Sequence, residues 1–165
     1  MIKGKKIFGL AVLFAAAFSA QALAQTPEQG CVVLKSVAET EKVEINAKGE
    51  KTTKLVPAAT AVPGSEVIWT VTANNICKMA LEKVSFNQAV PEHMTFVANS
   101  AIGPGLDIEY SLNGKTFAAA DQLTVVENGV TRKARPEEIR HLRWNFKTSF
   151  APGAQAMGRF RATLN

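Results

Sequence analysis

The sequence has few residues of the kinds that carry most enzyme and metal chemistry. Its 165 residues include two histidines, two cysteines and one tyrosine. The chain contains no glycine-rich phosphate loop, no nucleophile elbow and no Cys-x-x-Cys motif. Both histidines, His93 and His141, lie in segments that read as a turn or the start of a strand, where we expect surface residues. The sequence therefore predicts no catalytic residue, no metal ligand and no cofactor, and we expect a protein that is not an enzyme.

Long apolar runs are also missing, apart from one at the amino terminus. A lysine-rich start at residues 3–6 precedes the apolar run Ile7–Ala17, and Ala22–Ala24 supplies the small residues of a cleavage site. A membrane span needs about 20 apolar residues, so this run is short for a bilayer anchor, although an uncleaved anchor is the alternative. The pattern predicts a signal peptide at residues 1–24 and a single exported domain at residues 25–165. We expect that domain in the periplasm, at the cell surface or outside the cell, with no stable membrane insertion.

The charge of the chain is modest once this segment is removed. Loss of its three lysines lowers the formal net charge from +5 to +2, so the sequence pI of 9.4 overstates how basic the exported protein is. Nucleic-acid-binding domains carry a concentrated basic surface. The composition therefore indicates no nucleic-acid partner.

The rest of the sequence reads as short strands separated by turn residues, which is typical of an all-β sandwich. In the clearest example Val67, Trp69, Val71 and Ala73 share one face of an alternating strand. Strands are expected at residues 31–39, 43–46, 52–56, 65–74, 81–87, 94–98, 106–112, 123–127, 130–133 and 142–147, with a last strand that follows the Ala151–Gly153 turn and ends at the carboxyl terminus. One helical turn is expected at 136–138, and Gly158 is expected to mark a β-bulge.

The two cysteines are each placed next to an expected strand. If the strand that starts at Cys31 pairs with the one that ends at Asn74, Cys31 lies close to Cys77. An exported chain with two such cysteines most simply forms one disulfide. Two free thiols, or a metal pair completed by His93 or His141, are the alternatives.

A group of cations gathers towards the carboxyl terminus. If the strands on either side of the Ala151–Gly153 turn are antiparallel neighbours, Arg143, Lys147, Arg159 and Arg161 project from one face. Such a face would attract an anionic glycan or lipopolysaccharide. The alternative is an ordinary charged face that protects edge strands from aggregation.

Several segments together resemble a bacterial conserved-repeat domain of unknown function, number eleven in its series. They are Val62–Asn75, Val90–Ser100, Tyr110–Phe117 and Arg135–Trp144, followed by the turn Ala151–Gly153 and its strand. The resemblance covers about residues 31 to 165. It implies an immunoglobulin-like antiparallel β-sandwich with Greek-key-type connections, on exported or surface proteins of bacteria, and it implies no catalytic residues. The single copy in this chain differs from relatives with tandem arrays.

These observations lead to one main hypothesis and one alternative. We expect an exported, non-enzymatic structural or protein-interaction module of the bacterial cell envelope, with an assembling surface subunit as a variant. Its partner would be an envelope or surface protein, or a second copy joined by strand pairing, and the expected free edge is the last strand, which ends at Asn165. The alternative is a module that binds an anionic glycan or lipopolysaccharide through the basic face.

Overall fold

The structure, a computed structural model, describes residues 30–165. The expected signal peptide and its cleavage site lie outside these residues. Within them, none of the helices combines the length and the apolar character that crossing a bilayer requires.

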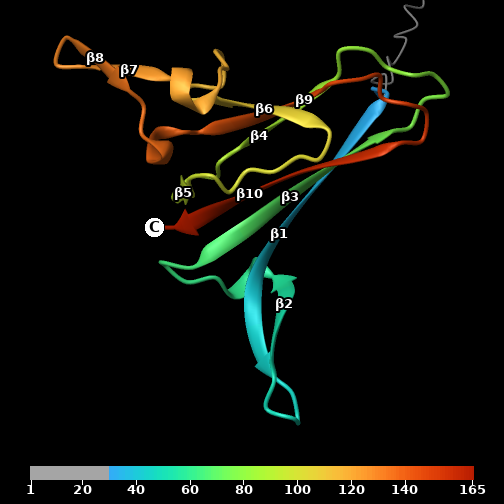
Figure 1. The fold of residues 1–165 in the computed structure, drawn as a ribbon, viewed down its shortest axis with the longest axis vertical. Coiled ribbons are helices and arrows are strands. Elements are labelled where there is room, and N and C mark those ends of the chain that lie inside the picture. Colours follow the sequence, from blue (N-terminus) through green and yellow to red (C-terminus); the bar gives the residue numbers. More distant parts are fainter. Residues whose placement is uncertain (1–29) are drawn as a thin grey trace, which may run out of the picture.

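Two antiparallel sheets face each other, and a separate hairpin projects from one end (Figure 1). The first sheet has the order β2 (Lys51–Pro57), β1 (Val32–Ile45), β3 (Glu66–Asn75), β10 (Gln155–Leu164) and β5 (Met94–Phe96). The second has the order β4 (Ser85–Ala89), β9 (His141–Phe146) and β6 (Leu106–Ser111). The hairpin consists of β7 (Thr124–Glu127) and β8 (Val130–Lys133). Within residues 30–165, three short 3-10 helices lie in the connections: η1 (Ala58–Thr60), η2 (Ala120–Gln122) and η3 (Pro136–Glu138).

The chain crosses between the two sheets several times. It passes from β3 to β4, returns at β5, crosses again to β6, and comes back from β9 to β10. Crossing connections of this kind join antiparallel strands into an immunoglobulin-like sandwich with Greek-key-type topology. The expected fold class is confirmed, and so is the helical turn at Pro136–Glu138.

The core lies between the sheets and is built from alternating positions. Leu142 and Trp144 on β9 face Val71 on β3 and Phe160 on β10, and all four side chains are fully buried. The ring of Phe86 stacks on Trp144 with 5.2 Å between centroids. Full burial of one large apolar side chain contributes about 1.5–3 kcal/mol, so these few residues supply much of the packing energy.

The two cysteines form the expected disulfide. Val32 lies opposite Asn75 in the β1–β3 ladder, which places the Cα atoms of Cys31 and Cys77 5.1 Å apart. The described residues contain no free cysteine, so the free-thiol and metal alternatives are excluded. The bridge ties the start of β1 to the segment that follows β3.

Strand β1 is longer than the sequence pattern suggests. The expected strands at 31–39 and 43–46 are one continuous strand, because Glu39–Ile45 pairs with Lys51–Pro57 of β2 while residues 32–39 pair with β3. Asn46 closes the turn, since its Oδ1 accepts hydrogen bonds from the backbone N–H groups of Lys48 and Glu50. The resulting β1–β2 hairpin extends beyond the second sheet (Figure 1).

Candidate functional site

The basic face expected from the sequence is not formed. Strands β9 and β10 belong to different sheets, so the expectation that they are neighbours is wrong. Arg143 on β9 and Lys147 just after it belong to the second sheet, whereas Arg159 and Arg161 alternate with the buried Phe160 on the outer face of the first. The reason is that both strands have a fully buried face. These faces meet across the core, and the intervening turn crosses between layers.

The cations of the second sheet have local partners. Arg143 donates a hydrogen bond from Nε to Oδ1 of Asn87 at 3.0 Å, and its guanidinium lies 3.6 Å from the ring centroid of Phe117. Lys147 forms an ion pair with Asp107 at 3.0 Å. Their charge is therefore engaged with neighbouring side chains of the second sheet and of the connection that follows β6.

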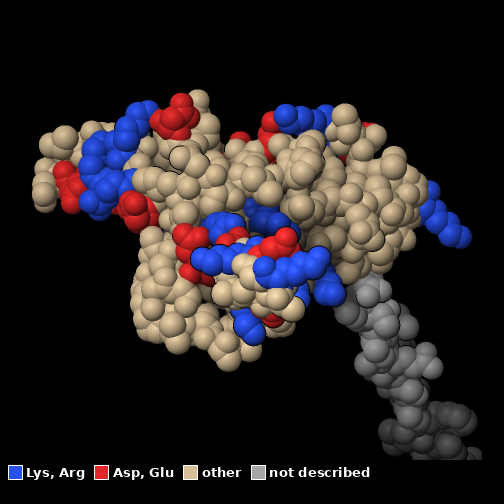
Figure 2. Space-filling model, turned by 60° about the horizontal axis from the view of Figure 1, so that its bottom comes forward, with Lys and Arg blue, Asp and Glu red and all other residues tan. Residues whose placement is uncertain are grey.

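The cations of the first sheet are also engaged. Arg161 contacts the carboxylates of Glu41 at 2.6 Å and Glu66 at 3.2 Å, and the hydrogen bond to Glu41 raises the pKa of the guanidinium. Arg159 donates from Nε to the hydroxyl of Thr70 at 3.0 Å. On the face shown in Figure 2, basic and acidic side chains are interspersed. The arrangement is a mixed-charge surface.

The free edge expected at the last strand is also absent. Strand β10 lies inside the first sheet, between β3 and β5, and pairs with both. The backbone N–H of Asn165 donates to the carbonyl of His93. Strand addition at Ala162–Leu164 of β10 would therefore require β5 to be displaced.

A different edge of the first sheet is open. Strand β2 pairs with β1 only from Glu39 onwards, so the segment Val32–Ala38 has β3 on one side and no strand on the other within residues 30–165. We call this segment the open edge. The carbonyl of Cys31 accepts a hydrogen bond from the N–H of Ile76. Because alternate residues of an antiparallel strand bond to the same neighbour, the odd-numbered residues of β1 bond to β3. The N–H and C=O groups of Val32, Leu34 and Ser36 consequently point away from the sheet.

The side chains of the open edge are mainly aliphatic and partly exposed. Val33, Leu34 and Val37 have exposed fractions of 37%, 47% and 38%. Lys35 is the one charged residue of the segment, and it takes part in none of the ion pairs among the described residues. Natural sheets commonly protect a free edge with several charges, a proline or a cover. This edge has one lysine.

The other sheet edges are shorter or protected. Strand β5 has three residues and β4 has five. The backbone of Tyr110 on β6 exchanges two hydrogen bonds with Ala118, which covers part of that edge. Strand β2 carries Lys51 and Lys54 and ends at Pro57. Among these strands, β1 offers the longest open aliphatic segment.

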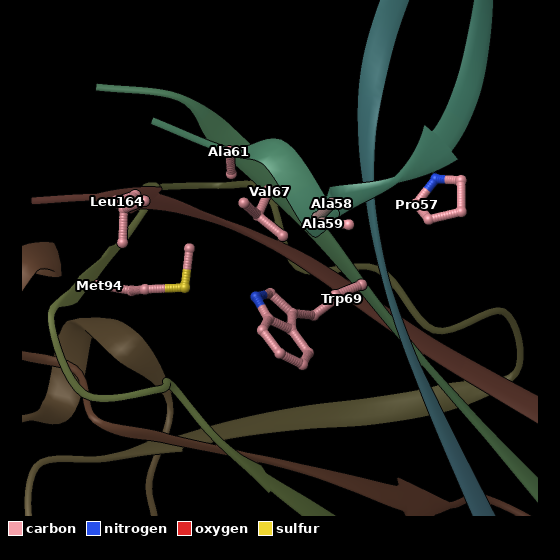
Figure 3. Close-up of a pocket in the computed structure, with 9 residues that line it drawn as sticks. Pro57, Ala58, Ala59, Ala61, Val67, Trp69, Met94 and Leu164 are labelled. Carbon is pink, nitrogen blue, oxygen red and sulfur yellow. The ribbon is translucent and has the colours of Figure 1, made fainter. Parts of the chain in front are cut away.

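An apolar pocket of about 480 Å³ adjoins the open edge (Figure 3). Its lining residues come from β1, the end of β2, η1, β3, β5 and β10, and they are Ala38, Pro57, Ala58, Ala59, Ala61, Val67, Trp69, Met94 and Leu164. None of these side chains is titratable. The indole of Trp69 turns its nitrogen edge towards Val67 and Met94, and the buried Nε1 has no hydrogen-bond partner.

Neither histidine is among the residues that line this pocket. A Cβ built on Gly114 would lie 2.9 Å from Nε2 of His141, so the imidazole packs on this glycine. His93 adopts a left-handed backbone conformation with φ 61° just before β5. The part of the chain that the structure describes contains no cluster of three or more His, Cys, Asp or Glu residues able to hold a metal.

Comparison of the chain with protein-family models, curated proteins and solved structures finds no match. The resemblance to the conserved-repeat domain therefore stays a prediction.

Proposed function

We propose that this protein is an exported, non-enzymatic interaction module of a bacterial cell envelope, which binds an extended strand of a partner protein at the open edge of β1. The observation that carries the proposal is the row of unpaired backbone groups on Val32, Leu34 and Ser36. An added strand satisfies such groups with main-chain hydrogen bonds, and its alternate side chains provide specificity.

The disulfide supports this role because it orders the edge before a partner arrives. The bond from Cys31 to Cys77 holds the residue just before the open edge, and pairing with β2 holds Glu39, the residue just after it. An edge fixed at both ends loses less conformational entropy on binding, which favours affinity.

Export is supported by two independent features. The amino-terminal residues 1–24 have the lysine-rich start, apolar run and small residues of a signal peptide. The disulfide is of the kind that persists in oxidising compartments. The resemblance to a domain of bacterial surface proteins favours the cell envelope. Binding of an anionic glycan has weaker support, because the four expected cations lie on two different sheets.

A pair of proline variants tests the proposal. Ser36→Pro removes an N–H that points to the open edge and leaves the odd-numbered bonds to β3 intact, a placement in which edge strands tolerate proline. Thr53→Pro is the matched control, because the register places its N–H on the outer edge of β2. Both should retain the fold by circular dichroism and differ little in melting temperature.

The readout is cross-linked capture from the envelope fraction of the source cells. The wild-type protein and Thr53→Pro should capture the same partner bands, and Ser36→Pro should lose them. Equal capture by all three proteins, or no capture by the wild-type protein, would overturn the proposal.

A further inference from the structure

The position of the apolar pocket restricts which strand the open edge can accept. The lining of the pocket includes Trp69 on β3, Ala38 on β1 and Pro57 at the end of β2. Figure 3 shows Trp69 and Pro57 at the pocket. A strand added to the open edge would lie in the same row as β2, since both occupy the side of β1 away from β3. The pocket thus reaches the row that the added strand would enter.

The inner face of the open edge has small side chains next to this pocket. Ser36 lies opposite Val71 and Ala38 lies opposite Trp69, so both face the inside of the sandwich. A residue of the added strand opposite Ser36 would be a diagonal neighbour of Ala38. Diagonal neighbours lie about 7–8 Å apart, within reach of an aromatic side chain. Because every side chain around the pocket is apolar apart from the Trp69 N–H, an aromatic ring suits it.

The outer face of the same segment adds a charge requirement. Lys35 projects from the face of the sheet opposite to that of Ser36, and it lies beside Thr72 of β3. It forms no ion pair within residues 30–165. An acidic residue directly opposite Lys35 would form a favourable cross-strand pair. Two copies of the protein could also pair through their open edges. In the registers that pair most of the segment, the two Lys35 side chains would lie on the same face, either directly opposite or diagonal to each other. The lysine therefore disfavours self-pairing and favours an acidic partner.

Building on the proposed function, we infer that the partner strand runs antiparallel to β1 and carries an aromatic residue opposite Ser36, followed at once by an acidic residue opposite Lys35. The aromatic ring fills the pocket beside Ala38 and Trp69. Aliphatic residues at the next inward positions cover Leu34, which is 47% exposed. Every strand pair in the described structure is antiparallel, which supports this direction.

Short peptides test the inference on the intact exported protein. The reference peptide is acetylated and amidated, with the sequence Thr-Phe-Glu-Val-Thr-Val, so that phenylalanine falls opposite Ser36 and glutamate opposite Lys35. Tryptophan fluorescence gives the readout, because Trp144 is fully buried whereas Trp69 lines the pocket. The reference peptide should bind with a Kd below about 1 mM and shift the emission. Replacement of its phenylalanine by alanine should weaken binding about tenfold or more.

A charge exchange provides the matched control. A peptide with lysine in place of glutamate should bind about threefold to tenfold more weakly at low salt, with a smaller difference at high salt. The variant Lys35→Glu should reverse this preference, and because its side chain is on the surface it should fold normally. Equal binding of all peptides to both proteins would overturn the inferred partner chemistry.

Three further outcomes separate this inference from the proposed function. If no peptide binds at about 1 mM but capture of a partner still depends on Ser36, strand addition stands and the aromatic–acidic sequence is wrong. If N-acetyl-phenylalanine amide binds as tightly as the peptide, the pocket is a small-molecule site. If the protein alone sediments as a dimer that Ser36→Pro dissociates, the occupant is a second copy. Each of these results would overturn the inference.

Discussion

The indole of Trp144 on β9 lies directly against the backbone of Gly158 on β10, across the interface between the two sheets. A Cβ atom built on Gly158 would lie 2.6 Å from Cδ2 of Trp144, and one built on Gly103 would lie 3.0 Å from Nε1. Gly158 pairs with Val71 in a regular ladder, so the expected β-bulge is absent. The glycine instead allows the two sheets to approach closely enough to enclose the indole.

Gly158→Ala should therefore destabilise the sandwich by about 1–3 kcal/mol, because the methyl group overpacks the core against the indole. Urea denaturation measures the effect. Gly30→Ala is the control, since a Cβ built there meets nothing within 4 Å. In the double variant with Trp144→Phe, the loss should be smaller than the sum of the two single losses. Additive losses would show that the contact is not the cause.

Asn75, at the end of β3, should be a second sensitive position. Its side-chain amide is fully buried and donates to the carbonyls of Met79, Phe150 and Ala151, while Oδ1 accepts from the N–H of Cys77. Asn75→Ala removes these bonds. The carbonyls of Phe150 and Ala151 still accept from the N–H groups of Leu81 and Ala154, but the carbonyl of Met79 and the N–H of Cys77 lose their partner. Each buried unpaired group costs about 1–3 kcal/mol. We expect a loss of stability above about 2 kcal/mol in urea denaturation, on the same principle.

The neighbouring Asn74 is the matched control for this prediction. Its Oδ1 is buried without a hydrogen-bond partner, so Asn74→Ala removes no hydrogen bond made by that atom. The Asn74 variant should therefore lose much less stability than the Asn75 variant. Similar losses at both positions would contradict the role assigned to the Asn75 network.

Local strand and turn patterns predicted most of the elements of this fold. Alternation gave the inward faces of β3 and β9, and the Asn128–Gly129 turn has positive φ at both residues, 52° and 78°, as the dipeptide predicts. The disulfide followed from the pairing of neighbouring strands near Cys31 and Cys77. These features depend on local conformation or on adjacent strands, which the sequence displays directly.

The candidate site could not be predicted in the same way. Alternation identifies the buried face of a strand but not the sheet that contains it, so β9 and β10 looked like a hairpin although they face each other across the core. The open edge depends on where β2 stops pairing, at Glu39, which is a property of the whole sheet. The sequence feature that could have indicated the open edge is the run of consecutive aliphatic residues Val32–Leu34, which breaks the alternation of apolar and polar residues.

Acid should weaken the contact between β8 and η3. Glu138 accepts hydrogen bonds from the guanidinium of Arg132 and from the backbone N–H of Arg135, and these lower the pKa of Glu138 from 4.5 to about 2. Because the folded pKa is depressed, the stabilisation is present above pH 4.5 and is lost as the pH falls towards 2. Amide chemical shifts of β8 and η3 should move in this window. In Glu138→Gln the movement at η3 should disappear and that at β8 should shrink, because Glu127, which also pairs with Arg132, still titrates. Glu137→Gln, at an exposed position, should retain both.

The open edge should show an alternating pattern of hydrogen exchange. The amides of Val33, Lys35 and Val37 bond to β3 and should exchange slowly, while those of Val32, Leu34 and Ser36 face solvent and should exchange fast. Residue-resolved NMR exchange measures the pattern. Uniform slow exchange across the segment would show that the edge is already covered.

Reduction of the disulfide should loosen this edge before it loosens the core. The bridge spans 46 residues, and in the loop-entropy description it contributes about 4 kcal/mol. Between Val32 and Ala38, β1 pairs with one strand only, so the bond from Cys31 is the main restraint on its outer end. In the Cys31→Ser, Cys77→Ser double variant, the slow amides of the open edge should exchange faster by more than those of β9 in the core. Capture of the partner strand should fall with them, because the edge must be ordered before it can bind. Equal acceleration of β1 and β9 would instead mean that the bridge acts on the whole sandwich and does not specifically order the open edge.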